Sequence, residues 1–406
     1  MTLPRRIRLL LALLTVSLGL SAQIDPRLHT DGDTAVFFVN VYPGSDIYEL
    51  EGHSAIVVTT PYRDIAYNFG VFDFNSPNFV YRFVKGETDY MAVAWPWLGF
   101  LYPYTAAGRH VRAHRLNLTP EETAETIRLL EENVLPENAV YRYNYVKDNC
   151  ATRPLAVVER ALPDSITLGA APAESYAERL TFRNIMRHYH RNYPWYQFGI
   201  DLALGSGIDR PLPRRAASFA PVELDSMLAG ATSSGRPLVS YTIDLDNFPA
   251  DNAVLAPTPA WLSPLTVFWV LFAVTLALSI HDIRLKRLSR WFDTIFFSVL
   301  GLTGLLLTFL IFISVHEATS PNWLYLWLNP LCLLVPILIW IKRTKKVLIC
   351  YQIANFAVLT GLLAFWPLIP QSANPAFLPI ILAEMLRSAT YISTCRHQTD
   401  RKINLK

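Results

Sequence analysis

Five apolar segments fill the last third of the chain and constrain its fold more than any other feature. Short polar loops separate them, and they cover residues 262–280, 292–314, 323–341, 347–368 and 376–392. Each is close to the roughly 20 residues that an α-helix needs to cross the hydrocarbon core of a bilayer. The sequence therefore predicts an all-α bundle of five transmembrane helices over residues 258–395.

The loops between these segments alternate in charge. Lys and Arg are abundant in HDIRLKRLSR, in KRTKK and in the tail over residues 396–406, whereas HEATSPN and IPQSAN contain neither. Loops rich in Lys and Arg stay in the cytoplasm. We therefore expect a cytoplasmic C-terminus and an exported position for the residues that precede the bundle.

The N-terminus predicts the same topology. Three Arg residues precede an apolar core from Leu9 to Leu20, which is too short to span a bilayer, and the small residues Ser21 and Ala22 follow. This arrangement is typical of a cleaved secretory signal peptide, although an uncleaved amphipathic anchor is the alternative. The expected organisation is a signal peptide over 1–22, an exported domain with its linker over 23–257, the membrane domain over 258–395 and a basic tail over 396–406.

Two charged residues lie inside the fifth apolar segment. Glu384 and Arg387 are three residues apart, so they share one helix surface. Charges at this depth are functional candidates by default. The alternative, which we favour, is an internal pair that neutralises itself.

The exported part reads as mixed α and β structure. Apolar runs at 35–41, 54–59 and 65–69 predict strands, the first two continuous enough to be buried. The segment LTPEETAETIRLLEENVL predicts a helix, with Thr119 as N-cap, Pro120 in the first turn and Glu122 completing a capping box. Cys150 stands at a turn that leads into a further helix.

A lone cysteine is the main chemical feature of the exported part. The chain has four cysteines, of which Cys150 alone precedes the membrane segments, so a free thiol is more plausible than a disulfide. A helix N-terminus lowers the pKa of a thiol. His53, in GHSAIVV, could act as its base, and Asn68, in YNFG, could orient that His. The alternatives are an inert buried thiol, a packing His and a turn Asn.

Other residues could contact a lipid substrate. The aromatic stretch MAVAWPWLGFLYPY contains Trp95 and Trp97, which would bind the bilayer interface if exposed or pack in the core if buried. Tyr67 is a further candidate neighbour of the site. Neither an HExxH motif nor a Cys/His cluster with ligand spacing occurs, so no metal or other cofactor is expected. The net charge of only +3 and the lack of a basic aromatic patch argue against nucleic acid.

The order His then Cys resembles permuted papain-like thiol enzymes of the NlpC-type peptidase and lecithin:retinol acyltransferase kind. GHSAIVV, YNFGVFDFNSPNFVYRFVKGETDY and YRYNYVKDNCATRP, followed by five terminal helices, resemble the Lnb family of bacterial lipoprotein N-acyltransferases over nearly the whole mature chain. The resemblance implies an α+β, permuted papain-like exported domain followed by the five-helix bundle. It also implies a multi-pass protein of the inner membrane with its catalytic domain in the periplasm.

The resemblance implies an activity as well. An acyl chain would move from a phospholipid donor, through a thioester on Cys150, to the N-terminal amine of a diacylated lipoprotein, with His53 as base. A membrane-tethered thiol hydrolase, either a cell-wall peptidase or a lipase, is the alternative with the same Cys–His pair. A non-catalytic membrane scaffold is the third possibility.

Overall fold

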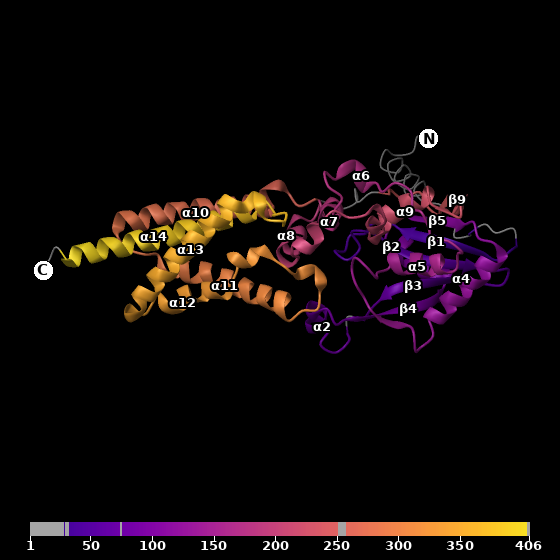
Figure 1. Ribbon diagram of the computed structural model, residues 1–406, viewed down its shortest axis with the longest axis horizontal. Helices are drawn as coiled ribbons and strands as arrows, with labels where there is room; N and C mark the ends of the chain where they lie inside the picture. The colour runs from indigo at the N-terminus through magenta and orange to yellow at the C-terminus, as the bar shows by residue number, and fades with distance from the viewer. Residues whose placement is uncertain (1–27, 29–31, 74, 251–256, 404–406) are drawn as a thin grey trace, which may run out of the picture. The chain divides into compact units, whose positions relative to one another are not determined.

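The computed structural model describes residues 28, 32–73, 75–250 and 257–403, with side chains as far as residue 395 (Figure 1). The chain forms two compact units, and each unit is assembled from segments that are not consecutive in the sequence. The first unit comprises Met1–Phe72, Asp89–Tyr176 and Arg214–Leu255, and the second comprises Asp73–Thr88, Ala177–Pro213 and Ala256–Lys406. The predicted signal peptide lies outside the described residues, as do the side chains of the basic tail.

The first unit is built on a seven-stranded antiparallel sheet with the strand order β6-β4-β3-β2-β1-β5-β9. The strands are β1 (Ala35–Val41), β2 (His53–Thr59), β3 (Asp64–Val71), β4 (Asp89–Pro96), β5 (Val111–Leu116), β6 (Val140–Arg142) and β9 (Val239–Asp244); β7 (Thr232–Ser233) and β8 (Arg236–Pro237) pair separately. The three strands predicted from the apolar runs are therefore confirmed as the neighbours β1, β2 and β3.

Helices cover both faces of the sheet, which explains why every residue of β1 is buried. On one face, α3 (Trp97–Ala106) packs Trp97, Phe100 and Leu101 against alternate residues of β1 and β2, among them Val39 and Val57. The opposite face carries a buried polar network. There Ser54 donates to Asn40, and Asn40 donates to Asp225 of α9 (Pro221–Ala229). Successive residues of β2 thus contact different helices.

The remaining helices of this unit are α4 (Pro120–Asn133), α5 (Thr152–Arg160) and α6 (Ala173–Tyr176). The predicted capping box of α4 is confirmed. The Thr119 hydroxyl accepts the backbone N–H of Glu122, whose carboxylate accepts the N–H of Thr119. Two otherwise unpaired donors of the first helical turn are satisfied in this way.

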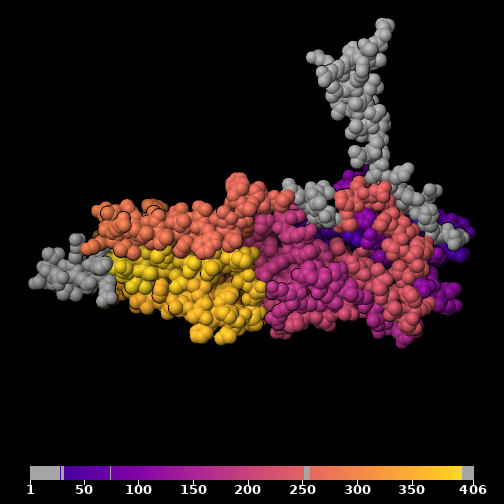
Figure 2. All heavy atoms as spheres, turned by 90° about the horizontal axis from the view of Figure 1, so that it is seen from above, coloured from indigo at the N-terminus to yellow at the C-terminus, as the bar shows by residue number. Residues whose placement is uncertain are grey.

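The second unit is a helical bundle. Its helices are α2 (Phe79–Lys85), α7 (Phe182–Tyr189), α8 (Pro194–Ala203), α10 (Pro264–Leu285), α11 (Arg290–Phe312), α12 (Leu334–Leu338), α13 (Lys345–Phe365) and α14 (Phe377–Ile403). By length and apolar composition, Pro264–Leu285, Arg290–Phe312 and Lys342–Leu368 could cross a membrane. Figure 2 shows the orange atoms of α10 lying along the yellow atoms of α14, and α14 also packs on α13.

The third apolar segment is not the continuous helix that its composition predicts. It forms two 3₁₀ turns, η6 (Trp323–Leu326) and η7 (Pro330–Leu333), followed by the short helix α12. Pro330 and Pro336 remove backbone donors from this stretch, which breaks the helical hydrogen-bond ladder. Such irregular backbone is tolerated at membrane depth only where protein surrounds it.

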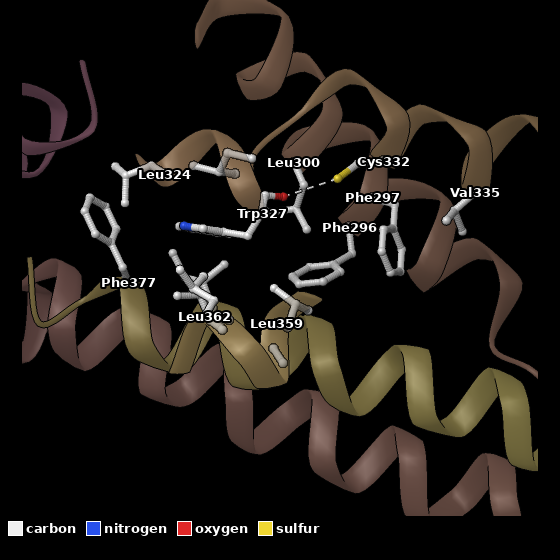
Figure 3. Packing of buried hydrophobic residues seen from close by; sticks show 14 of the residues in the cluster. Phe296, Phe297, Leu300, Leu324, Trp327, Cys332, Val335, Leu359, Leu362 and Phe377 are labelled. Carbon is white, nitrogen blue, oxygen red and sulfur yellow. Dashed lines mark hydrogen bonds between the residues drawn. The ribbon is translucent and has the colours of Figure 1, made fainter. Parts of the chain in front are cut away.

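Two glycines of α11 let this broken segment pack closely. A Cβ at Gly301 would lie 2.5 Å from Leu333, and one at Gly304 would lie 2.4 Å from the backbone of Asn329. Beyond them, Trp327 is buried in the core among residues such as Leu362 (Figure 3). Because these glycines have no side chain, the backbone of the broken segment can approach the backbone of α11 closely.

Arg387 does not pair with Glu384, so our prediction of an internal pair is wrong. Its guanidinium instead binds Asp293 at 2.6 Å and Asp282 at 2.8 Å, both on other helices of the bundle. Glu384 accepts a hydrogen bond from Asn355 of α13. The helical backbone allows the i,i+3 contact, but two carboxylates compete successfully for the Arg.

Candidate active site

His53 and Asn68 lie on neighbouring strands and are joined by a hydrogen bond. The register pairs Ala55 of β2 with Asn68 of β3, so residues 53 and 68 project from the same face of the sheet. His53 Nε2 lies 2.7 Å from Asn68 Oδ1. Since that oxygen can only accept, the imidazole proton resides on Nε2, and the lone pair of Nδ1 is left to act as a base.

Aromatic and cationic groups surround the imidazole. The ring of Tyr104 stacks on it, with 6.1 Å between centroids, and Phe100 lies 6.3 Å away. Arg109 in turn lies 4.9 Å from the Tyr104 ring. Burial, aided by the charge of Arg109, lowers the pKa of His53 to about 4. The base is therefore neutral at physiological pH.

The side chain of Asn149 fixes the backbone on either side of Cys150. The Asn149 carboxamide oxygen accepts the backbone N–H groups of Ala151 and Thr152, each at 2.9 Å, while its Nδ2 donates to the Phe219 carbonyl. The Asn149 side chain thereby satisfies two backbone donors at the start of α5. Cys150 occupies the turn immediately before that helix.

The sulfur of Cys150 lies at the end of the sheet that also carries His53. β2 pairs with β3 only from Ala55 onward, so the first two residues of β2 extend past the ladder. The freed backbone N–H of Ser54 donates to the sulfur of Cys150, and so does the hydroxyl of Tyr143. The thiol is thus hydrogen-bonded to the residue adjacent to His53.

The hydroxyl of Tyr143 also lies beside the backbone N–H of Cys150. Tyr90 stacks on the Tyr143 ring at 4.2 Å and holds it in place. Gly70, with φ +86°, passes close on the other side, where a Cβ would lie 3.2 Å from the Tyr143 ring and 3.5 Å from the Cβ of Cys150. Only glycine fits this backbone conformation without strain and leaves room for both side chains.

The pKa of Cys150 is raised, to about 11, and our expectation of a lowered value is wrong. Burial is the largest cause, and the negative charge of Glu51 adds to it. The hydrogen bonds from Ser54 and Tyr143 favour the thiolate but do not offset the loss of hydration. In the resting site a neutral thiol therefore stands near a neutral imidazole, rather than a thiolate–imidazolium pair.

The structure places the other three predicted site residues in different environments. Tyr67 is consecutive with Asn68 and so projects from the opposite face of the sheet, where it is buried and senses the charge of Glu131 on α4. Trp97 is core, with 2% of its surface exposed, whereas Trp95 on β4 is 39% exposed. Trp97 stacks on Phe100, whose ring lies 6.3 Å from that of His53, so it belongs to the core beside the His53–Asn68 pair.

Tyr143 and Gly70 are parts of this site that reasoning from the sequence missed. Tyr143 lies in YRYNY, where alternating tyrosines give no indication of which one contacts the thiol. Gly70 lies two residues after Asn68 in YNFG, a segment in which we considered Asn68 but gave the glycine no role. Among the residues that the structure describes, no group of three or more His, Cys, Asp or Glu could hold a metal ion.

Two family models match the chain. The model of the Lnb N-terminal periplasmic domain matches residues 26–186, and that of the Lnb transmembrane domain matches residues 257–398. Together they cover most of the chain. Neither the curated proteins nor the solved structures compared with it contain a match.

Proposed function

Because the chain belongs to the Lnb family, with a periplasmic and a transmembrane domain, we propose that it is a lipoprotein N-acyltransferase of the bacterial inner membrane. Its acyl donor would be a phospholipid, and its acceptor the N-terminal amine of a diacylated lipoprotein. The observation that carries the proposal is a buried Cys150 thiol hydrogen-bonded to the residue that follows His53, with His53 itself held by Asn68.

In the first half-reaction, the sulfur of Cys150 attacks the ester carbonyl carbon of the phospholipid. Nδ1 of His53 takes the thiol proton as the C–S bond forms, because neither group is ionised beforehand. The tetrahedral oxyanion collapses, the C–O bond breaks, and His53 gives the proton to the departing lysophospholipid oxygen. An imidazolium with a pKa of about 4 is a strong acid for that last step.

In the second half-reaction, the amine nitrogen of the lipoprotein attacks the thioester. His53 accepts a proton from this nitrogen, the C–S bond breaks, and the proton returns to the sulfur. Water is a competing nucleophile, and the burial of Cys150 restricts its access. The Tyr143 hydroxyl and the backbone N–H of Cys150 are the donors best placed to bind the oxyanion in both steps.

The orientation in the membrane belongs to the same proposal. The basic loops and the C-terminus would lie in the cytoplasm, with the Cys150 domain in the periplasm. Fusion of a periplasm-dependent reporter enzyme after residue 250 and after residue 406 tests this. We expect activity only from the first fusion.

The decisive experiment for the activity is mass spectrometry of a lipoprotein's N-terminal peptide from cells that lack any other N-acyltransferase. Cells with the wild-type chain should yield a triacylated peptide, and cells with Cys150→Ala a diacylated one. Persistence of the triacylated peptide in the variant would refute the thioester route. Free fatty acid released without peptide acylation would instead indicate the thiol hydrolase.

A further inference from the structure

The segment between β3 and β4 is anchored on the bundle of the second unit. The backbone N–H of Val315 donates to the carbonyl of Lys85 at 2.8 Å, the Ser314 hydroxyl donates to the carbonyls of Val84 and Lys85, and the His316 ring bonds the Phe83 carbonyl at 2.8 Å. These bonds tie α2 to the end of α11 and the loop that follows it, beside which it lies in Figure 1.

The anchored helix leaves its large apolar side chains exposed. Val80, Tyr81 and Phe83 are 73%, 54% and 49% exposed, and no residue of α2 is buried. Contiguous exposed apolar side chains on a folded protein mark an interaction surface. The helix also contains two cations and no acidic residue; Arg82 donates to the Glu87 carbonyl at 2.9 Å, and Lys85 pairs with the Glu87 carboxylate at 2.8 Å.

The position of this surface along the membrane normal can be measured along α11, which contacts α2 near one of its ends. Trp291, at the end of α11 next to the basic loops, is 72% exposed and packs on Trp340 at 4.9 Å, as expected for one aromatic belt of a membrane protein. Phe309, which contacts Tyr81 at 6.0 Å, lies 18 residues further along α11. At about 1.5 Å per residue this is a separation of about 27 Å, close to the ~30 Å hydrocarbon thickness of a bilayer.

From this exposure, charge and depth we propose that α2 is an interfacial anchor that inserts Val80, Tyr81 and Phe83 among the phospholipids of the leaflet remote from the basic loops. The aromatic rings would lie at the headgroup–acyl boundary, and Arg82 would add positive charge at the level of the phosphates. The chain on either side of this segment continues into β3 and β4. Gly70 of β3 and Tyr90 of β4 pack around Cys150 and Tyr143.

This continuity suggests what the anchor is for. If the chain takes its acyl donor from the bilayer, which rests on the proposed function, α2 would contact the phospholipids of the leaflet from which the donor is taken. The membrane contact itself does not depend on the reaction and can be tested without it.

The test of contact uses the full-length protein in nanodiscs of phosphatidylethanolamine and phosphatidylglycerol. The photocrosslinking residue p-benzoylphenylalanine replaces Val80, Val299 of the α11 lipid face, or Tyr62. Tyr62 is 95% exposed in a polar turn of the first unit. We expect phospholipid adducts at positions 80 and 299 at comparable yield and a yield at least tenfold lower at 62. Absence of lipid adducts at 80, or crosslinks there to protein alone, would overturn the proposal.

A second arm measures the consequence for catalysis. The double variant Val80→Asp/Tyr81→Asp should lower the rate of thioester formation from bilayer phospholipid at least tenfold. It should leave thioester formation from monomeric dibutyrylphosphatidylcholine unchanged, and Val80→Ser/Tyr81→Ser provides a milder variant if the first folds poorly. Equal rates for variant and wild type on bilayer lipid would contradict the anchor's role. Failure of the wild type to form a thioester with either lipid would contradict the proposed function while leaving the crosslinking result intact.

Discussion

His53 Nε2 and Asn68 Oδ1 are 2.7 Å apart, on adjacent strands whose register projects both side chains from one face of the sheet. This bond fixes the imidazole tautomer and directs the basic nitrogen away from Asn68. The proposed chemistry of Cys150 depends on that tautomer.

Replacing Asn68 should impair catalysis through His53. In Asn68→Ala the imidazole can rotate and change tautomer, so we expect kcat to fall about 10- to 100-fold with KM little changed. Asn68→Asp keeps an acceptor but adds a negative charge, which should raise the pKa of His53. The low-pH limb of the pH–activity profile of Asn68→Asp should therefore lie at higher pH than in the wild type. An unchanged pH profile in Asn68→Asp would contradict this role.

The pH dependence of activity should reflect a site that is neutral at rest. His53 must be unprotonated to act as base, and with a pKa of about 4 it remains so well below its ordinary 6.5. We expect the acid limb of kcat/KM near pH 4 and slow alkylation of Cys150 by iodoacetamide at pH 7, rising toward pH 11. Rapid alkylation with a midpoint below pH 8 would show a thiolate instead.

The same groups should affect stability in opposite pH ranges. The folded pKa of His53 is lowered, so its contribution is complete above pH 6.5 and is lost as the pH falls toward 4. The folded pKa of Cys150 is raised from 9 to about 11, so its contribution is complete below pH 9 and is lost as the pH rises toward 11. Thermal unfolding should be measured as a function of pH for two variants. His53→Gln should lose less stability than the wild type as the pH falls from 6.5 to 4, and Cys150→Ala should lose less as the pH rises from 9 to 11.

Removing the hydroxyl of Tyr143 should weaken oxyanion binding while leaving the fold intact. Loss of one such donor costs about 10²- to 10³-fold in kcat where it has been measured, and we expect an effect at the lower end because the N–H of Cys150 remains. Tyr67→Phe is the matched control, since Tyr67 is also buried but projects from the face opposite the His53–Asn68 pair. Single-turnover acylation measures both. A Tyr143→Phe variant as fast as Tyr67→Phe would exclude the hydroxyl from catalysis.

Gly70→Ala should damage both stability and the site. A side chain at φ +86° costs on the order of 1 kcal/mol or more, and the new methyl group would press on the Tyr143 ring and on Cys150. Gly235→Ala is the control, because Gly235 has φ +76° but open space around its Cβ position. Both variants should lower the unfolding temperature, whereas only Gly70→Ala should lose acylation activity.

Arg387→Met should destabilise the bundle. It leaves the carboxylates of Asp282 and Asp293 buried without their cation, a change that costs roughly 3–5 kcal/mol when a buried pair is broken. The triple variant that also carries Asp282→Asn and Asp293→Asn should recover part of this loss. Unfolding in detergent micelles measures both, and equal stabilities of the single and triple variants would argue against the ion cluster.

The sequence by itself determined features that depend on local periodicity and local chemistry. Strands β1 to β3 and the capping box of α4 follow from neighbouring residues, and so does the turn at Cys150 before a helix. The apolar length of α10, α11 and α13 likewise follows from composition, because spanning hydrocarbon is a requirement on consecutive residues.

Only the tertiary structure decided features that depend on competition between distant groups. The register of β2 and β3 brings Asn68 to His53 and sends Tyr67 to the other face. Burial raises the pKa of Cys150 against the hydrogen bonds around it, and Arg387 binds carboxylates about a hundred residues away rather than its neighbour on the helix. Desolvation and long-range pairing arise only when separate segments pack together, so no pattern within one segment encodes them.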